Sequence, residues 1–266
     1  MAEFPQILAK NLLENATVGG AGFTEHPIYK IEYIGDRSRM SKWQGSTGST
    51  TQRIIWSLVS GAQPADTFVF DRNFDLTGQS PKVTLQYADS AAGPWTTAKK
   101  EDGFTDMVLL SPDSSRVYWQ ALVPRTKGHW SLLLEGLSGV QRPPSIFNVW
   151  LGSRIELTFG PYGDFDPSEE EVVGEPVHGA AGGFQWTQRF RRRVLRAAFE
   201  NLTDSQCELL DRWWSEAAGD GKNWWWLSFP QSAPDDSLYL NCEGSARRFA
   251  FVNSVRHGAI EAREVI

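Results

Sequence analysis

The chain has 266 residues, which corresponds to one large or two ordinary domains. Apolar residues make up 41% of the chain and charged residues 22%, which excludes a chain that is disordered throughout. The formal net charge of −6 argues against a general nucleic-acid-binding protein with a basic surface.

The sequence has no segment typical of a membrane or secreted protein. No run approaches the ~18 consecutive apolar residues of a transmembrane helix. The start of the chain (MAEFPQILAK) lacks a basic region followed by an apolar one. Two cysteines, Cys207 and Cys242, are too few for a disulfide framework. We therefore expect cytoplasmic synthesis, no signal peptide and no membrane insertion.

The first part of the chain predicts a β-sandwich. Short apolar or alternating segments follow one another, with turn-forming residues between them, at residues 53–59, 67–74, 82–87, 107–110, 116–123, 130–135 and 146–151. A spacing of roughly 8–12 residues between such strands is typical of an antiparallel sandwich or jelly roll.

A segment rich in glycine, proline and acidic residues follows, from Gly160 to Gly183. It has no hydrophobic period and predicts a linker or long loop. We therefore expect a sandwich over residues 1–157, a linker over residues 158–183 and a second domain over residues 184–266.

The second domain predicts a small α+β unit, so the whole chain is expected to be mainly β. Residues 184–199 favour an arginine-rich strand. Thr203 and Gln206 form a capping-box motif that begins one helix, and Gly219 and Gly221 end it. Strand-like segments follow at residues 223–229, 238–241, 247–252 and 259–265. We expect one helix packed on a β-meander.

Three short phrases in the N-terminal part match a known family. They are Asn11–Val18 (NLLENATV), a strand followed by Gly93-Pro94-Trp95, and Ile146–Gly152 (IFNVWLG). Residues 11–157 therefore resemble the discoidin-like (coagulation factor 5/8 type C) jelly rolls. The resemblance implies ligand contacts on loops at one end of the barrel. Many members carry a disulfide that ties the ends of the domain, whereas this region has no cysteine.

The C-terminal part carries phrases of a second family. They are Arg193-Val194-Leu195, Leu202–Gln206 (LTDSQ), Leu210–Trp214 (LDRWW) and Gly221–Phe229 (GKNWWWLSF). Residues 184–266 therefore resemble a domain of tail-tip and baseplate proteins of long-tailed bacteriophages. The resemblance implies a distal or minor tail protein of the virion tail, made in the bacterial host. It also implies a ring-type oligomer with copies of itself and contacts with other tail proteins.

The sequence lacks a known catalytic or cofactor motif. The histidines form no metalloprotease pattern, and no nucleophile elbow, P-loop or dinucleotide fingerprint is present. Asp71–Asp75 imitates the start of a calcium loop, but Leu76 and Lys82 replace the Gly and Glu that such a loop needs. His178 beside the acidic residues 169–175 favours a solvated loop over a metal site. We expect no enzyme activity, metal or cofactor, and a structural calcium ion stays open.

Five arginines lie close together in the strand that opens the second domain: Arg189, Arg191, Arg192, Arg193 and Arg196. They could pair with another subunit or with the acidic residues 169–175, form a solvated surface, or line a channel for passing DNA. We take the first four as candidate subunit-interface residues.

Trp224, Trp225 and Trp226 follow one another in a predicted strand, which places the middle ring on the opposite face from the other two. All three could belong to the core. Alternatively, one face could anchor a subunit interface together with Trp213 of the helix, because tryptophan is a preferred interface anchor.

Trp43 and Trp95 are candidate glycan contacts in the sandwich. Trp43 precedes the polar loop 44–51 (QGSTGSTT), and aromatic rings favour sugar binding by stacking on apolar faces of the sugar. The alternative is a mobile loop with Trp95 in the core.

Three functions are compatible with these features. The leading hypothesis is a structural component of a phage-like tail tip or baseplate, which assembles through the second domain and displays the sandwich outward, where it contacts a host surface or glycan. The second is a soluble bacterial carbohydrate-binding module. The third is a hydrolase that uses carboxylates around Asp164–Glu171. These acids lie in a Gly/Pro-rich loop, which disfavours the third hypothesis.

Overall fold

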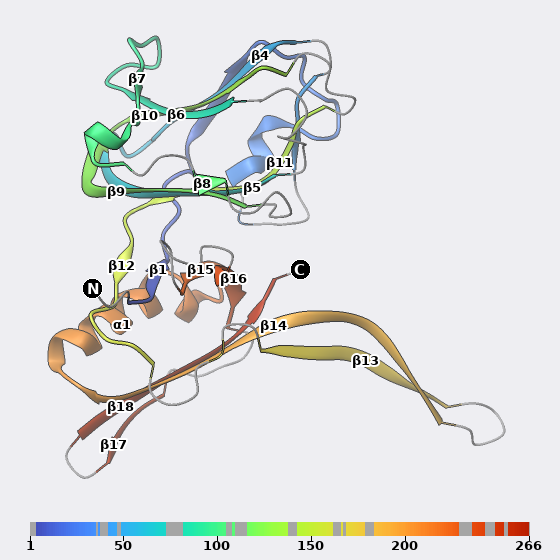
Figure 1. Cartoon of the computed structure of the whole chain (residues 1–266), viewed down its shortest axis with the longest axis vertical. Helices are drawn as coiled ribbons and strands as arrows, with labels where there is room; N and C mark the ends of the chain where they lie inside the picture. The colour runs from blue at the N-terminus through green and yellow to red at the C-terminus, as the bar shows by residue number, and fades with distance from the viewer. Residues whose placement is uncertain are drawn as a thin grey trace. The chain divides into compact units, whose positions relative to one another are not determined.

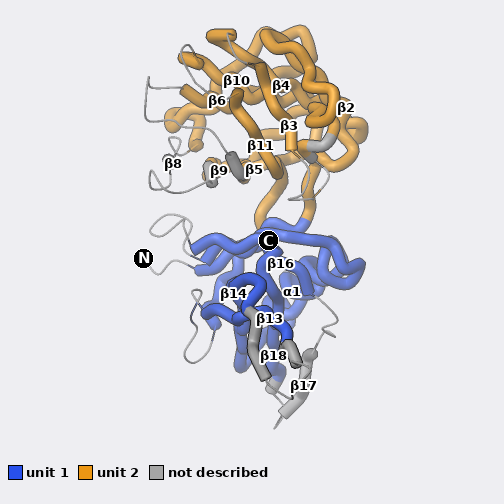
Figure 2. The backbone as a smooth tube through the Cα atoms, turned by 90° about the vertical axis from the view of Figure 1, so that its right-hand side faces the viewer, with its two compact units in different colours: residues 1–9, 155–266 blue, residues 10–154 orange. Residues whose placement is uncertain are grey.

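The computed structural model describes most of the chain. The described residues are 4–35, 37, 42–46, 49–72, 82–104, 108–109, 116–137, 143–161, 166, 169–178, 184–228, 236–242, 248–252 and 255–265. Two compact units make up the chain (Figure 2). Unit 1 combines residues 1–9 with residues 155–266, and unit 2 comprises residues 10–154.

Unit 2 consists of two five-stranded antiparallel sheets. The first sheet has the order β2-β4-β10-β6-β7 and the second has the order β3-β11-β5-β9-β8. The strands are β2 (Thr17–Ala21), β3 (Trp43–Gln44), β4 (Thr51–Ser57), β5 (Gln63–Arg72), β6 (Lys82–Ala88), β7 (Thr96–Thr97), β8 (Val108–Leu109), β9 (Arg116–Lys127), β10 (His129–Glu135) and β11 (Ser145–Gly152). Two 3-10 helices, η1 (Ile31–Gly35) and η2 (Lys100–Asp102), complete the unit.

The core of unit 2 lies between the inner faces of the two sheets. Ile54, Trp56 and Leu132 from the first sheet and Phe68 and Phe70 from the second are buried in one apolar cluster. Because strand side chains alternate between faces, the intervening residues of each strand lie on the outer faces. The sandwich predicted from the alternating segments is confirmed.

In the described part of the chain, unit 1 is a single antiparallel sheet with one α-helix. The sheet has the order β12-β1-β15-β16-β18-β14-β13, and β17 pairs with β18 (Figure 1). The strands are β1 (Gln6–Leu8), β12 (Ile155–Glu156), β13 (Glu170–His178), β14 (Phe184–Leu202), β15 (Trp224–Leu227), β16 (Leu238–Asn241), β17 (Arg248–Val252) and β18 (Val255–Glu264). The α-helix is α1 (Asp204–Glu216), followed by the 3-10 helix η3 (Ala218–Asp220).

Helix α1 begins at the predicted capping box. The Gln206 amide donates to Thr203 Oγ1 at 3.3 Å, and the Thr203 amide donates to Gln206 Oε1 at 2.8 Å. Cys207, Leu210 and Trp213 then form the buried side of the helix in the core of unit 1. The mainly β fold class, with a jelly roll and an α+β part that contains one helix, is confirmed.

The division of the chain differs from the predicted boundaries in two places. Strand β1 pairs with both β12 and β15, so the first nine residues belong to unit 1 and not to the sandwich. Residues 170–178, predicted as linker, form strand β13 and pair with β14. Glu170 and Glu171 lie opposite arginines of β14, and Glu175 forms an ion pair with Arg189. These charge pairs explain why a segment without hydrophobic period forms a strand.

Candidate functional site

The structure separates the two tryptophans proposed for glycan contact. Trp43 is fully buried in the core of unit 2 and packs edge-on against Phe23, with 5.0 Å between ring centroids. It presents no face to a sugar, so the prediction for Trp43 is corrected. Trp95 is only partly buried, and the guanidinium carbon of Arg53 lies 5.4 Å from the centroid of its ring.

Arg53 and Trp95 meet across the outer face of the first sheet. Arg53 belongs to β4, whose neighbours Gln52 and Ile54 are buried, so its side chain lies on the outer face. Trp95 directly precedes β7, and β10 and β6 lie between β4 and β7. Three strand spacings therefore separate β4 from β7, a distance of roughly 14 Å across the sheet. The two long side chains therefore have to lie along the sheet, across β10 and β6, to come into contact.

Two polar side chains on these intervening strands are buried. Each has one atom without a hydrogen-bond partner among the described residues. Ser131 of β10 is fully buried and Gln86 of β6 is 8% exposed, and the two residues are opposite one another in the sheet. Ser131 Oγ and Gln86 Oε1 lack a partner among the described residues, while Gln86 Nε2 donates to Thr97 Oγ1 at 3.4 Å. An unsatisfied buried polar group costs about 1–3 kcal/mol. This face is therefore destabilised where a ligand could supply the missing hydrogen bonds.

A hydrogen-bonded pair extends this polar surface. Ser57 of β4 and His129 of β10 are opposite one another, with 2.9 Å between Ser57 Oγ and His129 Nδ1. We call Arg53, Trp95, Ser131, Gln86 and Thr97 the sheet-face site. Sequence reasoning found only Trp95, because single polar residues on outward strand positions are indistinguishable from ordinary solvent-facing ones.

A second candidate surface lies on unit 1. Strand β14 is 19 residues long; its C-terminal part pairs with β18 and its N-terminal part pairs with β13. The segment in which β14 pairs with β13 extends from the sheet of unit 1 as a two-stranded ribbon (Figure 1). Val172 and Phe190, on opposite strands of this ribbon, are 47% and 39% exposed.

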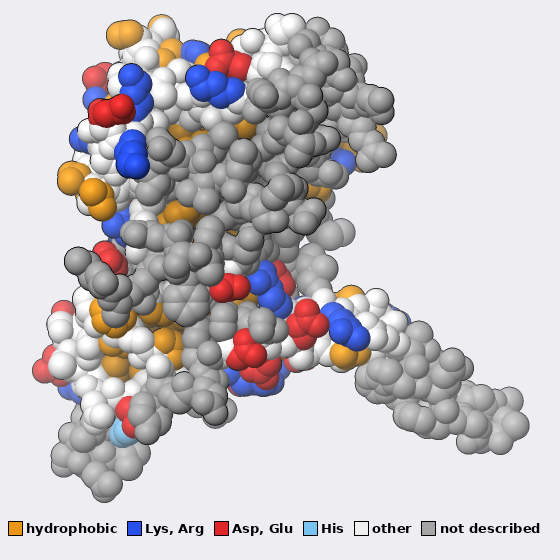
Figure 3. Space-filling model, viewed as in Figure 1, with side chains coloured by type: hydrophobic (Ala, Val, Ile, Leu, Met, Phe, Trp, Pro, Cys, Tyr) orange, Lys and Arg blue, Asp and Glu red, His pale blue; other side chains and the backbone are white. Residues whose placement is uncertain are grey.

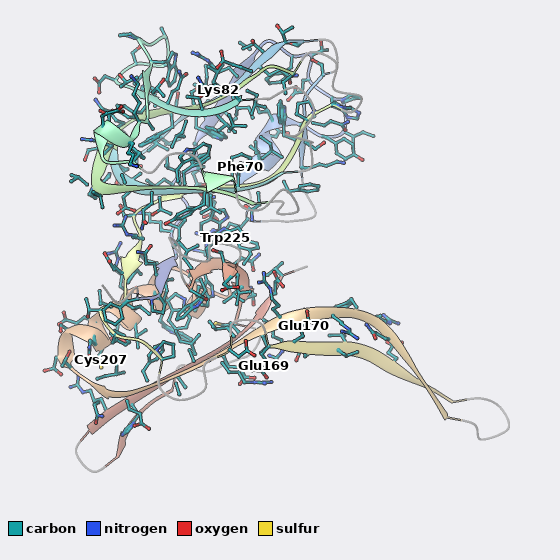
Figure 4. The ribbon with its side chains drawn as sticks, viewed as in Figure 1. Phe70, Lys82, Glu169, Glu170, Cys207 and Trp225 are labelled. Carbon is teal, nitrogen blue, oxygen red and sulfur yellow. The ribbon has the colours of Figure 1, made fainter. Side chains whose placement is uncertain are left out.

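The arginine cluster of β14 pairs within the chain. Arg189 contacts Glu175 at 2.6 Å, Arg191 contacts Glu170 at 3.7 Å, and Arg193 contacts Glu264 at 3.0 Å. The remaining pairs are Arg192 with Glu171 and Arg196 with Glu169. Figure 3 shows acidic and basic side chains next to one another here, and Glu169 and Glu170 mark the base of the ribbon in Figure 4.

Glu171 is the best-connected carboxylate of this network. Arg192 and Arg263 both reach its Oε1, the latter at 3.2 Å. Burial acts to raise the pKa of the Glu171 carboxyl, but the hydrogen bonds and charges of Arg192 and then Arg263 outweigh it, so its pKa is lowered. The structure therefore shows pairing with the acidic residues 169–175 for four of the five arginines, while Arg193 pairs with Glu264 of β18 instead.

The three consecutive tryptophans are fully buried. Trp224 contacts Trp213 of the helix edge-on, with 5.0 Å between ring centroids, and Trp225 on the opposite face lies 5.0 Å from Tyr239. All three have an exposed fraction of 0% and Trp213 of 5%. The prediction that these four tryptophans anchor a subunit interface is therefore corrected, because their rings are packed inside the chain. Trp225 is labelled in Figure 4.

The predicted acidic and metal-like motifs are described only in part. Asp71 ends β5 with its neighbour Arg72, while residues 73–81 lie outside the described residues. Asp164 and the side chain of His178 lie outside them as well. Among the residues that the structure describes, no group of three His, Cys, Asp or Glu side chains could hold a metal ion. No helix in this part of the chain is long and apolar enough to cross a membrane.

Comparisons with known proteins give similarities of fold only. No protein-family model matches the sequence, and no curated protein matches it. A chitosan-binding module of a Paenibacillus sp. IK-5 chitosanase/glucanase is 16% identical, with a TM-score of 0.41, over 53% of this chain and 97% of that one. A Clostridium perfringens module, CpGH89CBM32-4, solved with GlcNAc-α-1,4-galactose, is 17% identical, with a TM-score of 0.40, over 53% and 93%. At this level the similarities identify no ligand, and nothing in them points to a phage tail or baseplate.

Proposed function

We propose that unit 2 is a non-catalytic carbohydrate-binding module and that it binds sugar at the sheet-face site. The observation that carries the proposal is the partly exposed ring of Trp95, which lies on a sheet face lined by polar side chains. Sugars present both apolar C–H faces and hydroxyl groups. A site for them therefore combines an aromatic surface with hydrogen-bonding side chains, as this face does.

The test is glycan binding by the full chain, measured first on an array and then by calorimetry. Trp95→Ala is expected to abolish binding detectable on the array, while Tyr29→Ala is expected to leave it unchanged. Tyr29 is a suitable control because it is a partly exposed aromatic side chain of unit 2 that contacts His26 and Lys42 rather than Arg53. Loss of binding in Tyr29→Ala alone, or no glycan binding at all, would contradict the proposal.

The ribbon supports a second role, in which unit 1 assembles the protein. We propose that it joins copies of this chain, as expected of a non-enzymatic structural protein of a phage-like tail tip, made in the host cytoplasm and carried in the virion. A two-stranded ribbon is marginally stable alone, and its strand edges can pair with another chain. The exposed Val172 and Phe190, on opposite faces of the ribbon by its register, add apolar area that neighbouring subunits would cover.

Light scattering at two protein concentrations tests this second role. Association of the unmodified chain is expected, and Phe190→Asp is expected to abolish it. Val59→Asp is the matched control, because Val59 is a 74% exposed apolar residue of unit 2. A chain that stays monomeric at both concentrations, or equal effects of the two substitutions, would contradict assembly through the ribbon.

A further inference from the structure

The guanidinium of Arg53 is the cationic group of the sheet-face site. Within the described part of the chain it makes no ion pair, and it lies over the ring of Trp95. The N–H donors of a guanidinium point outward in its plane in a fixed fork. Arg53 therefore holds donors suited to a planar anion that binds through two oxygens.

The buried polar atoms lie under the path between Arg53 and Trp95. Ser131 is on β10 and Gln86 on β6, the two strands that these side chains have to cross. Ser131 Oγ can donate or accept a hydrogen bond and Gln86 Oε1 can accept one. Both atoms lack such a bond among the described residues. Sugar hydroxyl groups donate and accept, and are therefore suitable partners for both.

We infer that the ligand of this site is an acidic sugar, a hexuronate within a glycan chain. Its carboxylate binds the N–H donors of Arg53, its hydroxyl groups bind Ser131 Oγ and Gln86 Oε1, and its ring stacks on Trp95. The inference rests on the proposed carbohydrate-binding function of unit 2 and names the class of sugar.

Binding at the buried atoms requires the side chains of Arg53 and Trp95 to move apart. Their contact is a cation–π interaction at a partly exposed position, which is a weak interaction. A carboxylate offers Arg53 a stronger, charge-assisted pair of hydrogen bonds. The exchange then exposes Ser131 and Gln86 to the hydroxyl groups of the same sugar.

The experiment is calorimetry of the full chain with three trisaccharides: a galacturonate, the corresponding neutral galactose trimer, and a sulfated galactose trimer. The galacturonate is expected to bind most tightly. Arg53→Gln is expected to weaken its binding about ten- to a hundredfold, because hydrogen bonds to a charged group are lost. Arg53→Lys, which keeps the charge but not the paired donors, should give an intermediate loss. Lys30→Gln removes a positive charge elsewhere in unit 2 and should have no effect.

Ser131→Ala separates a role in binding from a role in folding. It is expected to weaken galacturonate binding roughly three- to tenfold while the melting temperature stays equal or rises, because the hydroxyl it removes has no partner among the residues that the structure describes. A fall in melting temperature with unchanged affinity would overturn this role for Ser131.

The outcomes distinguish the inference from the proposed function. Equal binding of neutral and acidic trisaccharides, unaffected by Arg53→Gln, would overturn the acidic ligand and leave the carbohydrate-binding function in place. Tightest binding of the sulfated trimer would overturn the carboxylate. Binding of none of these trisaccharides, together with a blank glycan array, would overturn both.

Discussion

The arginines of the ribbon in unit 1 and Arg53 of unit 2 have different surroundings. In unit 1, each arginine of the ribbon and its base forms an ion pair with a glutamate. The glutamate belongs to β13 or β18, or is Glu169, which directly precedes β13. In unit 2, Arg53 makes no ion pair among the described residues and contacts Trp95. The first arrangement uses the charge to hold two strands together. The second leaves the charge available to a ligand.

Trp224 of unit 1 and Trp95 of unit 2 differ in the same way. Trp224 is fully buried against the helix, whereas Trp95 lies partly exposed on a sheet face. A large apolar side chain that is fully buried against its neighbours contributes to stability. A group whose contacts are incomplete contributes little, and its presence on a polar face is better explained by binding. Substitutions in the two units should therefore separate stability from binding.

The largest expected effect is on the buried tryptophan. Trp224→Ala should lower the free energy of unfolding of unit 1 by about 3–5 kcal/mol, because a large cavity is left in the core. Trp95→Ala should change the stability of unit 2 by less than about 1 kcal/mol. Urea unfolding followed by hydrogen exchange of each unit measures both. Similar losses of unfolding free energy in Trp224→Ala and Trp95→Ala would contradict this difference between the two tryptophans.

The next effect concerns the arginines. Arg193 donates from Nε and Nη2 to the two carboxylate oxygens of Glu264, at 3.1 and 3.0 Å, and from Nη2 to the Ser237 carbonyl at 3.1 Å. Arg193→Ala should destabilise unit 1 by about 1.5–3 kcal/mol, because hydrogen bonds to a charged group are lost. Arg53→Ala should stay within about 0.5 kcal/mol. Thermal unfolding of the two variants provides the comparison, and a larger loss for Arg53 would contradict it.

Local signals were sufficient to predict the strands of unit 2 and the start of the helix. Alternation along a strand and the Thr203–Gln206 capping box depend on residues a few positions apart. The place of β1 in unit 1 depends instead on pairing with β15, more than two hundred residues further along. Strand β13 was missed for a related reason, because its glutamates are compensated by arginines of β14 and by Arg263 of β18.

The candidate site was predicted only at its aromatic residue. Trp95 is conspicuous in the sequence, and so is Trp43, but only tertiary packing shows that the second is buried. Arg53, Ser131 and Gln86 come from three separate strands, and their proximity follows from the strand order. Sequence periodicity gives the face on which a side chain lies but not the neighbouring strand.

A smaller effect tests the helix of unit 1. Thr203→Ala should destabilise this unit by about 1 kcal/mol, since it removes the side-chain acceptor of the Gln206 amide. Thr203→Ser keeps the oxygen and should restore most of the loss. Thermal unfolding of the three proteins checks this, and equal destabilisation by alanine and serine would show that the hydrogen bond is not responsible.

The smallest effect is also the only one that depends on pH. Because the pKa of Glu171 is lowered in the folded chain, its ionised form stabilises the ribbon at pH values above the ordinary glutamate pKa. This stabilisation is lost as the pH falls through the lowered pKa. Glu171→Gln should therefore weaken amide protection in β13 and β14 by about 1 kcal/mol or less at pH 7. The amide protection of the variant and of the unmodified chain should converge at acidic pH.

Glu170→Gln is the control, since Glu170 is half exposed and lies 3.7 Å from Arg191. Equal effects of the two substitutions at pH 7, or a difference that persists in acid, would show that the Arg192–Glu171–Arg263 contacts do not hold the ribbon.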